Sequence, residues 1–208
     1  MKKVFKILFL IIILGSIAFA IYYAYNTFFK SNNTRITVST IDGYDYKLTS
    51  NKNSYYKKLF KELKKILEED EVNEEEYAKL VSQLFVTDFF SLEDKYAKND
   101  IGGVEFVLEE EVTDYKLKAE ETYYKYVENN LNKTRRQKLP SVSKVTIEDI
   151  TQDSFDYKVL EEEKNDANAY IVKVSIKYSS SEFDNYQDSA NLIIVHKDKK
   201  LYIVEMNN

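Results

Sequence analysis

The stretch YIVKVSIKY, residues 170–178, carries the clearest strand pattern in the chain. Every second position holds an aromatic or β-branched residue: Tyr170, Val172, Val174, Ile176 and Tyr178. A period of two places these side chains on one face of a β-strand. The stretch therefore predicts a strand over 168–179 with one buried face.

The sequence before this strand keeps the same period of two, and the sequence after it contains two near-continuous runs of β-forming residues, Leu192 to Val195 and Leu201 to Met206. Four further strands are predicted, over 142–150, 155–161, 189–196 and 200–206, and the turns between them are short. Consecutive strands with short connections pair antiparallel. No helix pattern separates one strand from the next, so a doubly wound parallel sheet is not expected.

Upstream of residue 141 the apolar residues recur every three to four positions, which is typical of amphipathic helices. Helices are predicted over 54–69, 74–90 and 109–132, with a shorter helix from Ser91 to Tyr96. Helices followed by strands indicate an α+β domain over 53–208, with the helices packed on a curved antiparallel sheet.

Capping residues and glycines set the expected boundaries of these helices. Asn53 or Ser54 can cap the first helix, and Asn73, with a glutamate three positions later, fits a capping box for the second. The glycine pair at 102–103 predicts a tight turn before a short strand at 104–108.

The stretch RITVSTIDGYDYKLTS, residues 35–50, precedes the first helix. Its Asp-Gly dipeptide at 42–43 lies between alternating apolar residues, which is a strong hairpin signal. A two-residue turn would pair Ile41 with Tyr44, although the rest of that register matches poorly. We therefore predict an extended arm or hairpin within a linker region over 26–52.

The N-terminal stretch ILFLIIILGSIAFAIYYAY, residues 7–25, has 19 residues and no charge. A membrane-spanning helix needs about 20 predominantly apolar residues. Three lysines precede the stretch, so the positive-inside rule predicts a cytoplasmic tail at 1–6 and a domain outside the cell membrane. The stretch 7–25 is therefore expected to be a single-pass transmembrane helix, or uncleaved signal anchor. The membrane itself is the first partner that the sequence predicts.

A cleaved signal peptide is the alternative interpretation of the same stretch. Ala18-Phe19-Ala20 fits the small-residue pattern of a cleavage site. The apolar run continues past Ala20 to Tyr25, however, and its tyrosines suit an aromatic belt at the membrane interface. An uncleaved anchor is therefore favoured over cleavage after Ala20.

Composition excludes several classes of function. The chain has no cysteine, which removes thiol nucleophiles, thiolate metal sites and disulfides, and which favours a bacterial envelope. The part after Phe29 carries 27 basic and 35 acidic residues, a net charge of −8. An acidic domain argues against general binding to nucleic acid or to anionic lipid, because both need a basic surface.

One basic cluster departs from this acidic balance: Lys133, Arg135, Arg136 and Lys138. It is expected at the end of the long helix, where cations complement the helix dipole. A solvated helix end is favoured over a phosphate site, because charge runs usually form solvated faces.

No catalytic, metal or cofactor site is predicted. The single histidine, His196, is expected to be structural, and no glycine-rich phosphate loop or calcium loop pattern is present in the sequence. Asp88 is the one acid in the apolar stretch LFVTDFF, and Tyr123 lies on the long helix. Both are candidates for a pocket, although a buried Asp88 with a structural partner is favoured.

The order of the predicted elements resembles the nuclear transport factor 2-like fold over about 53–208. Two or three helices, a short strand, a long helix and an antiparallel sheet follow one another in this order. The layout is similar to the single-pass inner-membrane component of type IV secretion and conjugation systems. The resemblance implies a cone-like domain without catalysis that assembles with other envelope proteins.

The expected function is therefore a membrane-anchored extracytoplasmic domain for protein interaction or envelope assembly. Its partners would be other envelope proteins or further copies of the chain. The alternative is a small-ligand-binding or isomerase-like cone, with a pocket between the long helix and the sheet.

Overall fold

The computed structural model of the protein describes Ser16 and residues 36–207, and the latter form one compact unit. The predicted membrane helix at 7–25 lies outside the described residues, apart from Ser16. Among the residues that are described, no helix is both long and apolar enough to span a membrane.

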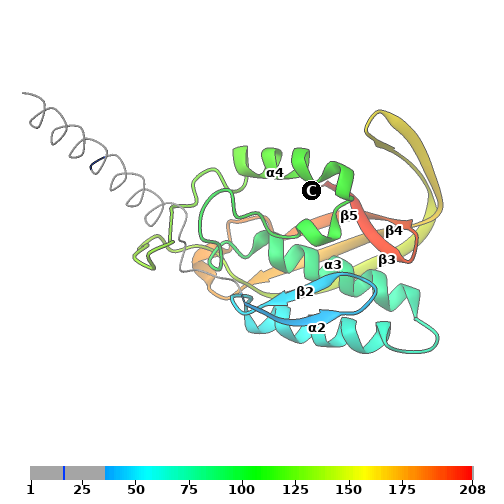
Figure 1. The fold of residues 1–208 in the computed structure, drawn as a ribbon, viewed down its shortest axis with the longest axis horizontal. Coiled ribbons are helices and arrows are strands. Elements are labelled where there is room, and N and C mark those ends of the chain that lie inside the picture. Colours follow the sequence, from blue (N-terminus) through cyan, green and yellow to red (C-terminus); the bar gives the residue numbers. More distant parts are fainter. Residues whose placement is uncertain (1–15, 17–35, 208) are drawn as a thin grey trace, which may run out of the picture. The chain divides into compact units, whose positions relative to one another are not determined.

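The unit is α+β, and its described residues form three α-helices and two antiparallel sheets (Figure 1). The first half contains β1 (Thr37–Ile41), β2 (Tyr46–Thr49), α2 (Ser54–Leu67), α3 (Glu74–Phe90), the 3-10 helices η2 (Val104–Phe106) and η3 (Glu109–Glu111), and α4 (Val112–Glu121). The second half contains β3 (Val142–Val159), β4 (Glu162–Tyr178), the 3-10 helix η4 (Ser181–Phe183), β5 (Ser189–Lys197) and β6 (Lys200–Asn207).

The larger sheet is an antiparallel meander in the order β3-β4-β5-β6, as the strand pattern predicts. The two strands predicted at 142–150 and 155–161 are in fact one strand, β3. Its pairing with β4 contains three irregularities, and one of them lies between Asp153 and Phe155. A bulge adds an unpaired residue and shifts the alternation, which explains why the sequence pattern suggested two strands.

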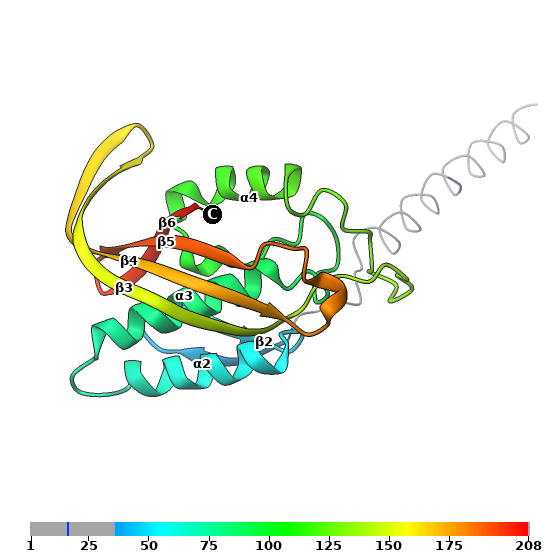
Figure 2. The ribbon, with the colours of Figure 1, turned by 180° about the vertical axis from the view of Figure 1, so that it is seen from behind.

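Beyond the reach of β5, β3 and β4 continue as a two-stranded ribbon, residues 153–169. Figure 2 shows this ribbon curling away from the rest of the sheet. Its tip is a tight turn at Leu160 and Glu161, both with positive φ (48° and 70°). Leu160 is 67% exposed there, and its N–H donates to Glu111 Oε1 at 3.0 Å.

The helices pack in layers around α3. α2 buries one stripe, as its amphipathic pattern predicts, whereas α3 is buried on most of its surface. α3 contacts α2 on one side and β3, β4 and β6 on another. The predicted N-caps are confirmed: Asn53 Oδ1 accepts from Tyr56 N at 2.8 Å, and Asn73 Oδ1 from Glu76 N at 3.1 Å.

The long helix predicted over 109–132 is wrong beyond Glu121. The Thr122 hydroxyl donates to the carbonyl of Lys118 at 2.6 Å, a local bond that competes with helical pairing. Two residues later, the buried Tyr124 hydroxyl donates to Phe89 O at 2.6 Å and accepts from Gly102 N at 3.0 Å. This tertiary anchor ends α4 and sends the chain into an irregular segment, 122–141.

Two short elements also differ from the prediction. The segment 91–96 has turns instead of a helix, and 104–108 contains η2 instead of a strand. Val107 still forms a single parallel bridge with Ile203 of β6, so the apolar pattern marked a real sheet contact.

β1 and β2 form a hairpin, but with a longer turn than two residues. Ile41 pairs with Tyr46 and not with Tyr44, so the residues 42–45 form the turn. Gly43 and Asp45 both adopt positive φ (77° and 57°) in this turn. The longer turn places Tyr46 in the core, where it is fully buried.

Candidate functional site

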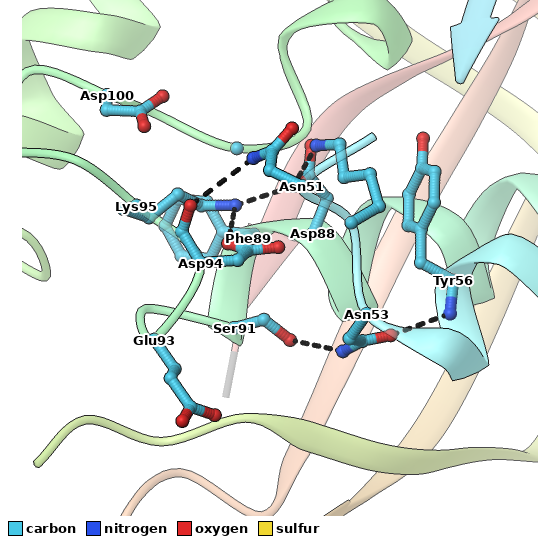
Figure 3. A network of polar contacts seen from close by, with 12 residues as sticks. Asn51, Asn53, Tyr56, Asp88, Phe89, Ser91, Glu93, Asp94, Lys95 and Asp100 are labelled. Carbon is cyan, nitrogen blue, oxygen red and sulfur yellow. Dashed lines mark hydrogen bonds and ion pairs between the residues drawn. The ribbon is translucent and has the colours of Figure 1, made fainter. Parts of the chain in front are cut away.

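Asp88 lies near the C-terminal end of α3 and is 5% exposed. Its Oδ1 forms ion pairs with Lys52 and with Lys95, the latter at 2.6 Å (Figure 3). Its Oδ2 accepts a hydrogen bond from the N–H of Gly103 at 2.8 Å. One carboxylate therefore joins the end of the hairpin, the end of α3 and the loop 91–103.

The charges in this network determine how Asp88 titrates. Burial by itself would raise the pKa of Asp88, but Lys52 and Lys95 together hold that pKa well below its usual range. Burial would likewise lower the pKa of Lys95, yet the carboxylates of Asp88 and Asp94 raise it. Both groups are therefore charged near neutral pH, and Asp88 is unsuited to act there as a general acid or base.

A half-buried acid, Glu105, adjoins this network. The Tyr56 hydroxyl donates to Glu105 Oε1 at 2.6 Å, and Lys47 N donates to Oε2 at 3.0 Å. Burial raises the pKa of Glu105, against the lowering effect of these bonds and of Lys52. Asp94, 2.7 Å from Lys95, also has its pKa raised by burial.

A separate cleft of about 620 Å³ lies between α4, α3 and the end of β6. Aromatic and aliphatic side chains form much of its lining: Phe85, Phe89, Val107, Leu108, Tyr115, Ala119, Tyr123, Ile203, Val204 and Met206. Charged side chains also border it: Glu111, Asp114, Lys118, Lys158 and Glu205. Volume and lining are within the range of small-molecule sites.

The tyrosines of this cleft use their hydroxyl groups within the protein. Tyr123 donates to the side-chain oxygen of Gln187, and Tyr115 donates to Gly102 O at 2.6 Å. Burial raises the pKa of Tyr123 to about 12, so this phenol is protonated near neutral pH. The tyrosine rings thus offer the cleft mainly apolar surface.

The structure does not bring the two pocket candidates together. Tyr123 lines the cleft, whereas Asp88 is absent from its lining and is held in the ion-pair network. Phe89, the next residue on α3, does reach the cleft, and its ring centre lies 5.4 Å from that of Tyr123. The sequence predicted Asp88 as the pocket residue on α3, whereas the side chain that lines the cleft is that of its neighbour Phe89.

His196 lies on β5 between two carboxylates from distant segments. Its Nδ1 lies 2.7 Å from Asp166 Oδ2, and the same oxygen accepts from its backbone N–H at 2.7 Å. Its Nε2 lies 3.3 Å from Glu74 Oε1, at the start of α3. Asp166 therefore fixes both the ring and the backbone, which fits the structural role expected for this histidine.

The predicted basic cluster lies in the irregular segment 122–141 and not at the end of α4, which corrects the expected location. Arg135 donates to the carbonyl groups of Glu93 (2.8 Å), Lys95 (2.9 Å) and Glu128 (3.2 Å). Lys138 forms an ion pair with Glu182 at 3.0 Å. Arg135 thus ties two loops together, while Lys133 and Arg136 are exposed.

Sequence reasoning missed the ion-pair network around Asp88. Lys52 and Lys95 lie in segments without periodicity, so no local signal marked them as buried. Long side chains with a charge are almost never fully buried unless paired. The only sequence signal was Asp88 itself, an acid inside an apolar helix.

Among the described residues, no group of three or more histidine, aspartate or glutamate side chains is placed to hold a metal ion. Comparison of the chain with protein-family models, with curated proteins and with solved structures finds no match.

Proposed function

We propose that the protein is a membrane-anchored, extracytoplasmic interaction domain that assembles with other envelope proteins or with itself, without catalysis. The observation that carries this proposal is the pairing of the buried acid Asp88. Asp88 forms ion pairs with Lys52 and Lys95, and the half-buried Glu105 accepts a hydrogen bond from Tyr56. Carboxylates held in this way serve the fold, and Asp88 is unsuited to acid–base chemistry near neutral pH.

The sequence supports the membrane anchor in this proposal, because the uncharged stretch 7–25 follows three lysines. Three helices before an antiparallel sheet further support a cone-like arrangement of the nuclear transport factor 2-like kind, although the expected short strand is absent from the described residues and α4 is shorter than expected. In that arrangement α4 lies across the sheet, in accord with the cleft between α4 and β6.

Cysteine labelling of the full chain tests the predicted topology. The chain has no cysteine, so Leu160→Cys and Lys2→Cys each introduce a unique thiol. With an N-terminus in the cytoplasm, a membrane-impermeant maleimide is expected to label Leu160→Cys in intact cells and Lys2→Cys only after lysis. Labelling of Lys2→Cys in intact cells, or a mature chain that begins at Ile21, contradicts the anchored topology.

A pull-down in mild detergent, read by mass spectrometry, then tests the interaction itself. Stoichiometric envelope partners, or a defined oligomer by light scattering, are expected. A monomer without partners would count against an assembly function.

A second candidate function is the binding of a small apolar ligand, and the observation that favours it is the 620 Å³ cleft. Water-soluble aromatic fragments such as indole are expected to bind there, as detected by saturation-transfer difference NMR. Met206→Trp places a large ring in the cleft and is expected to weaken binding at least about tenfold, since apolar ligands need the space.

Leu117→Trp is the matched control for this cleft experiment. Leu117 lies on α4, is exposed and does not line the cleft. It adds the same ring without occupying the site, so fragment binding is expected to be unchanged. Equal binding by both variants and the wild-type chain would place the fragments elsewhere.

A further inference from the structure

The segment between α4 and β3, residues 122–141, differs in charge from the rest of the domain. We name it the basic loop. It carries five basic side chains and one acidic one, whereas the other residues of 36–207 carry 20 basic and 34 acidic. A strongly acidic domain thus presents one compact cationic segment.

Three exposed cations of the basic loop are not engaged by any hydrogen bond or ion pair among the described residues. Arg135 is bonded to backbone carbonyls and Lys138 to Glu182. Lys125, Lys133 and Arg136 are exposed, and within the described part of the chain none of them lies within 4.0 Å of a carboxylate oxygen. Their charge is therefore available to a partner outside the domain.

The basic loop also exposes an aromatic side chain. Tyr126 is 77% exposed, more than any other large apolar side chain among the described residues, and Lys125 lies over its ring at 5.4 Å. Tyrosine side chains with basic neighbours are favoured at membrane–water interfaces, where the ring meets the headgroup region.

The basic loop lies at the end of the domain where the described chain begins. Ser50 N donates to Ile36 O at 2.9 Å, and the next residue, Asn51, donates to Asp94 O at 3.3 Å. Arg135 in turn holds the carbonyls on both sides of Asp94. Figures 1 and 2 both show the segment after α4 at the same end as the start of β1.

The length of the linker limits how far this end can lie from a membrane. The ten residues 26–35 separate the apolar stretch 7–25 from Ile36. Fully extended, they span at most about 36 Å. If 7–25 is the anchor, which is the proposed function, the basic loop is tethered within a few tens of ångströms of the lipid surface.

We propose that the basic loop docks on anionic phospholipid headgroups of the membrane in which the chain is anchored. Lys125, Lys133 and Arg136 attract the headgroups, and Tyr126 inserts at the interface. Such attraction acts only within about 8 Å at physiological salt, and the short tether supplies a high effective concentration. The acidic remainder is repelled by the same surface, so the contact also fixes the orientation of the domain.

A depth measurement on the full chain in nanodiscs tests this docking. Thr134→Cys, in the basic loop, carries an environment-sensitive fluorophore, and the discs contain a headgroup spin-labelled lipid as quencher. Discs of phosphatidylcholine alone are compared with an equal mixture of phosphatidylcholine and phosphatidylglycerol. Several-fold stronger quenching in the anionic discs is expected, and it is expected to disappear at high salt. A label on Leu160→Cys, at the ribbon tip, is expected to show no lipid dependence.

Two triple variants that lose the same number of positive charges, one in the basic loop and one elsewhere, show whether the position of the charges matters. Lys125→Gln, Lys133→Gln and Arg136→Gln together are expected to reduce the quenching in anionic discs to the level in phosphatidylcholine. Each basic side chain near such a surface contributes roughly fivefold to binding. Lys144→Gln, Lys173→Gln and Lys177→Gln, all exposed on β3 and β4, remove the same charge elsewhere and are expected to keep the wild-type quenching.

Three outcomes would overturn the proposal. Equal quenching in the two kinds of disc contradicts an anionic docking surface, and equal loss in both triple variants shows a nonspecific charge effect. A chain that does not remain in either kind of disc has no membrane anchor, which contradicts the proposed function. A chain that remains in both discs but shows equal quenching contradicts only the docking of the basic loop.

Discussion

Replacing Asp88 by asparagine is expected to lower the free energy of unfolding by about 3–5 kcal/mol. The substitution keeps the size of the side chain and an oxygen for the Gly103 N–H. It removes the negative charge that two buried lysines share, so that Lys52 loses its ion-pair partner and Lys95 keeps only Asp94. Denaturant unfolding followed by circular dichroism measures the loss.

Glu182→Gln is the matched control for Asp88→Asn. It is also a carboxylate-to-amide exchange in an ion pair, but the Lys138–Glu182 pair is exposed. Exposed pairs contribute between nothing and about 1 kcal/mol. A loss in Asp88→Asn no larger than in Glu182→Gln would mean that the buried network adds nothing to stability.

The pH dependence of the free energy of unfolding is an independent test of the contribution of Asp88 to stability. A carboxyl whose pKa is depressed by folding contributes stability above its unfolded pKa, about 3.9, and this contribution is lost as the pH falls toward the folded value. Asp88 is such a group. The fall in stability below about pH 4 is therefore expected to be smaller in Asp88→Asn than in the wild-type chain.

The strands could be predicted from the sequence because their signal is local. Tyr170, Val172 and Val174 occupy every second position, and the side chains of all three are buried in the sheet. The N-caps Asn53 and Asn73 were readable for the same reason, since a cap bonds a backbone group three residues away. Antiparallel order followed from the short turns.

Elements decided by distant partners could not be read from the sequence. α4 ends at Glu121 because Tyr124 is held by backbone groups of residues 89 and 102, and neither contact is visible in the local pattern. β3 continues through its irregularities because β4 pairs with its whole length. Tertiary context overrides local propensity in both cases.

The candidate site could be predicted only in part, because its contacts also depend on distant segments of the chain. Tyr123 reaches the cleft because the chain beyond α4 turns toward α3, where its ring packs against Phe89 and Phe90. Asp88 marked a special position correctly, but only the fold shows that its partners are two lysines from separate loops. The sequence showed the basic residues of the loop as a cluster. Which of these cations lack an ion-pair partner depends on the fold, so the sequence could not show it.

Gly102 connects the network to the cleft, and its backbone has little freedom to move. Its N–H donates to the Tyr124 hydroxyl at 3.0 Å, and its carbonyl accepts from the Tyr115 hydroxyl at 2.6 Å. A Cβ at this position would overlap the backbone carbonyl of Asp88. Relief of that overlap requires a shift of α3 or of the segment around Gly102, and the hydrogen bonds to the buried Tyr124 and the half-buried Tyr115 oppose such a shift.

Gly102→Ala is therefore expected to destabilise the protein by about 3 kcal/mol or more, at the upper end of the usual cost of overpacking. Gly43→Ala is the comparison, because Gly43 has φ of 77° and its added Cβ would meet only the flexible end of Lys199. Its cost is expected at about 1–2 kcal/mol, the penalty of a left-handed conformation. Denaturant unfolding of both variants measures the difference. Similar losses in the two would show that the loop at Gly102 yields easily, and that the contact between this loop and Asp88 is not a rigid part of the fold.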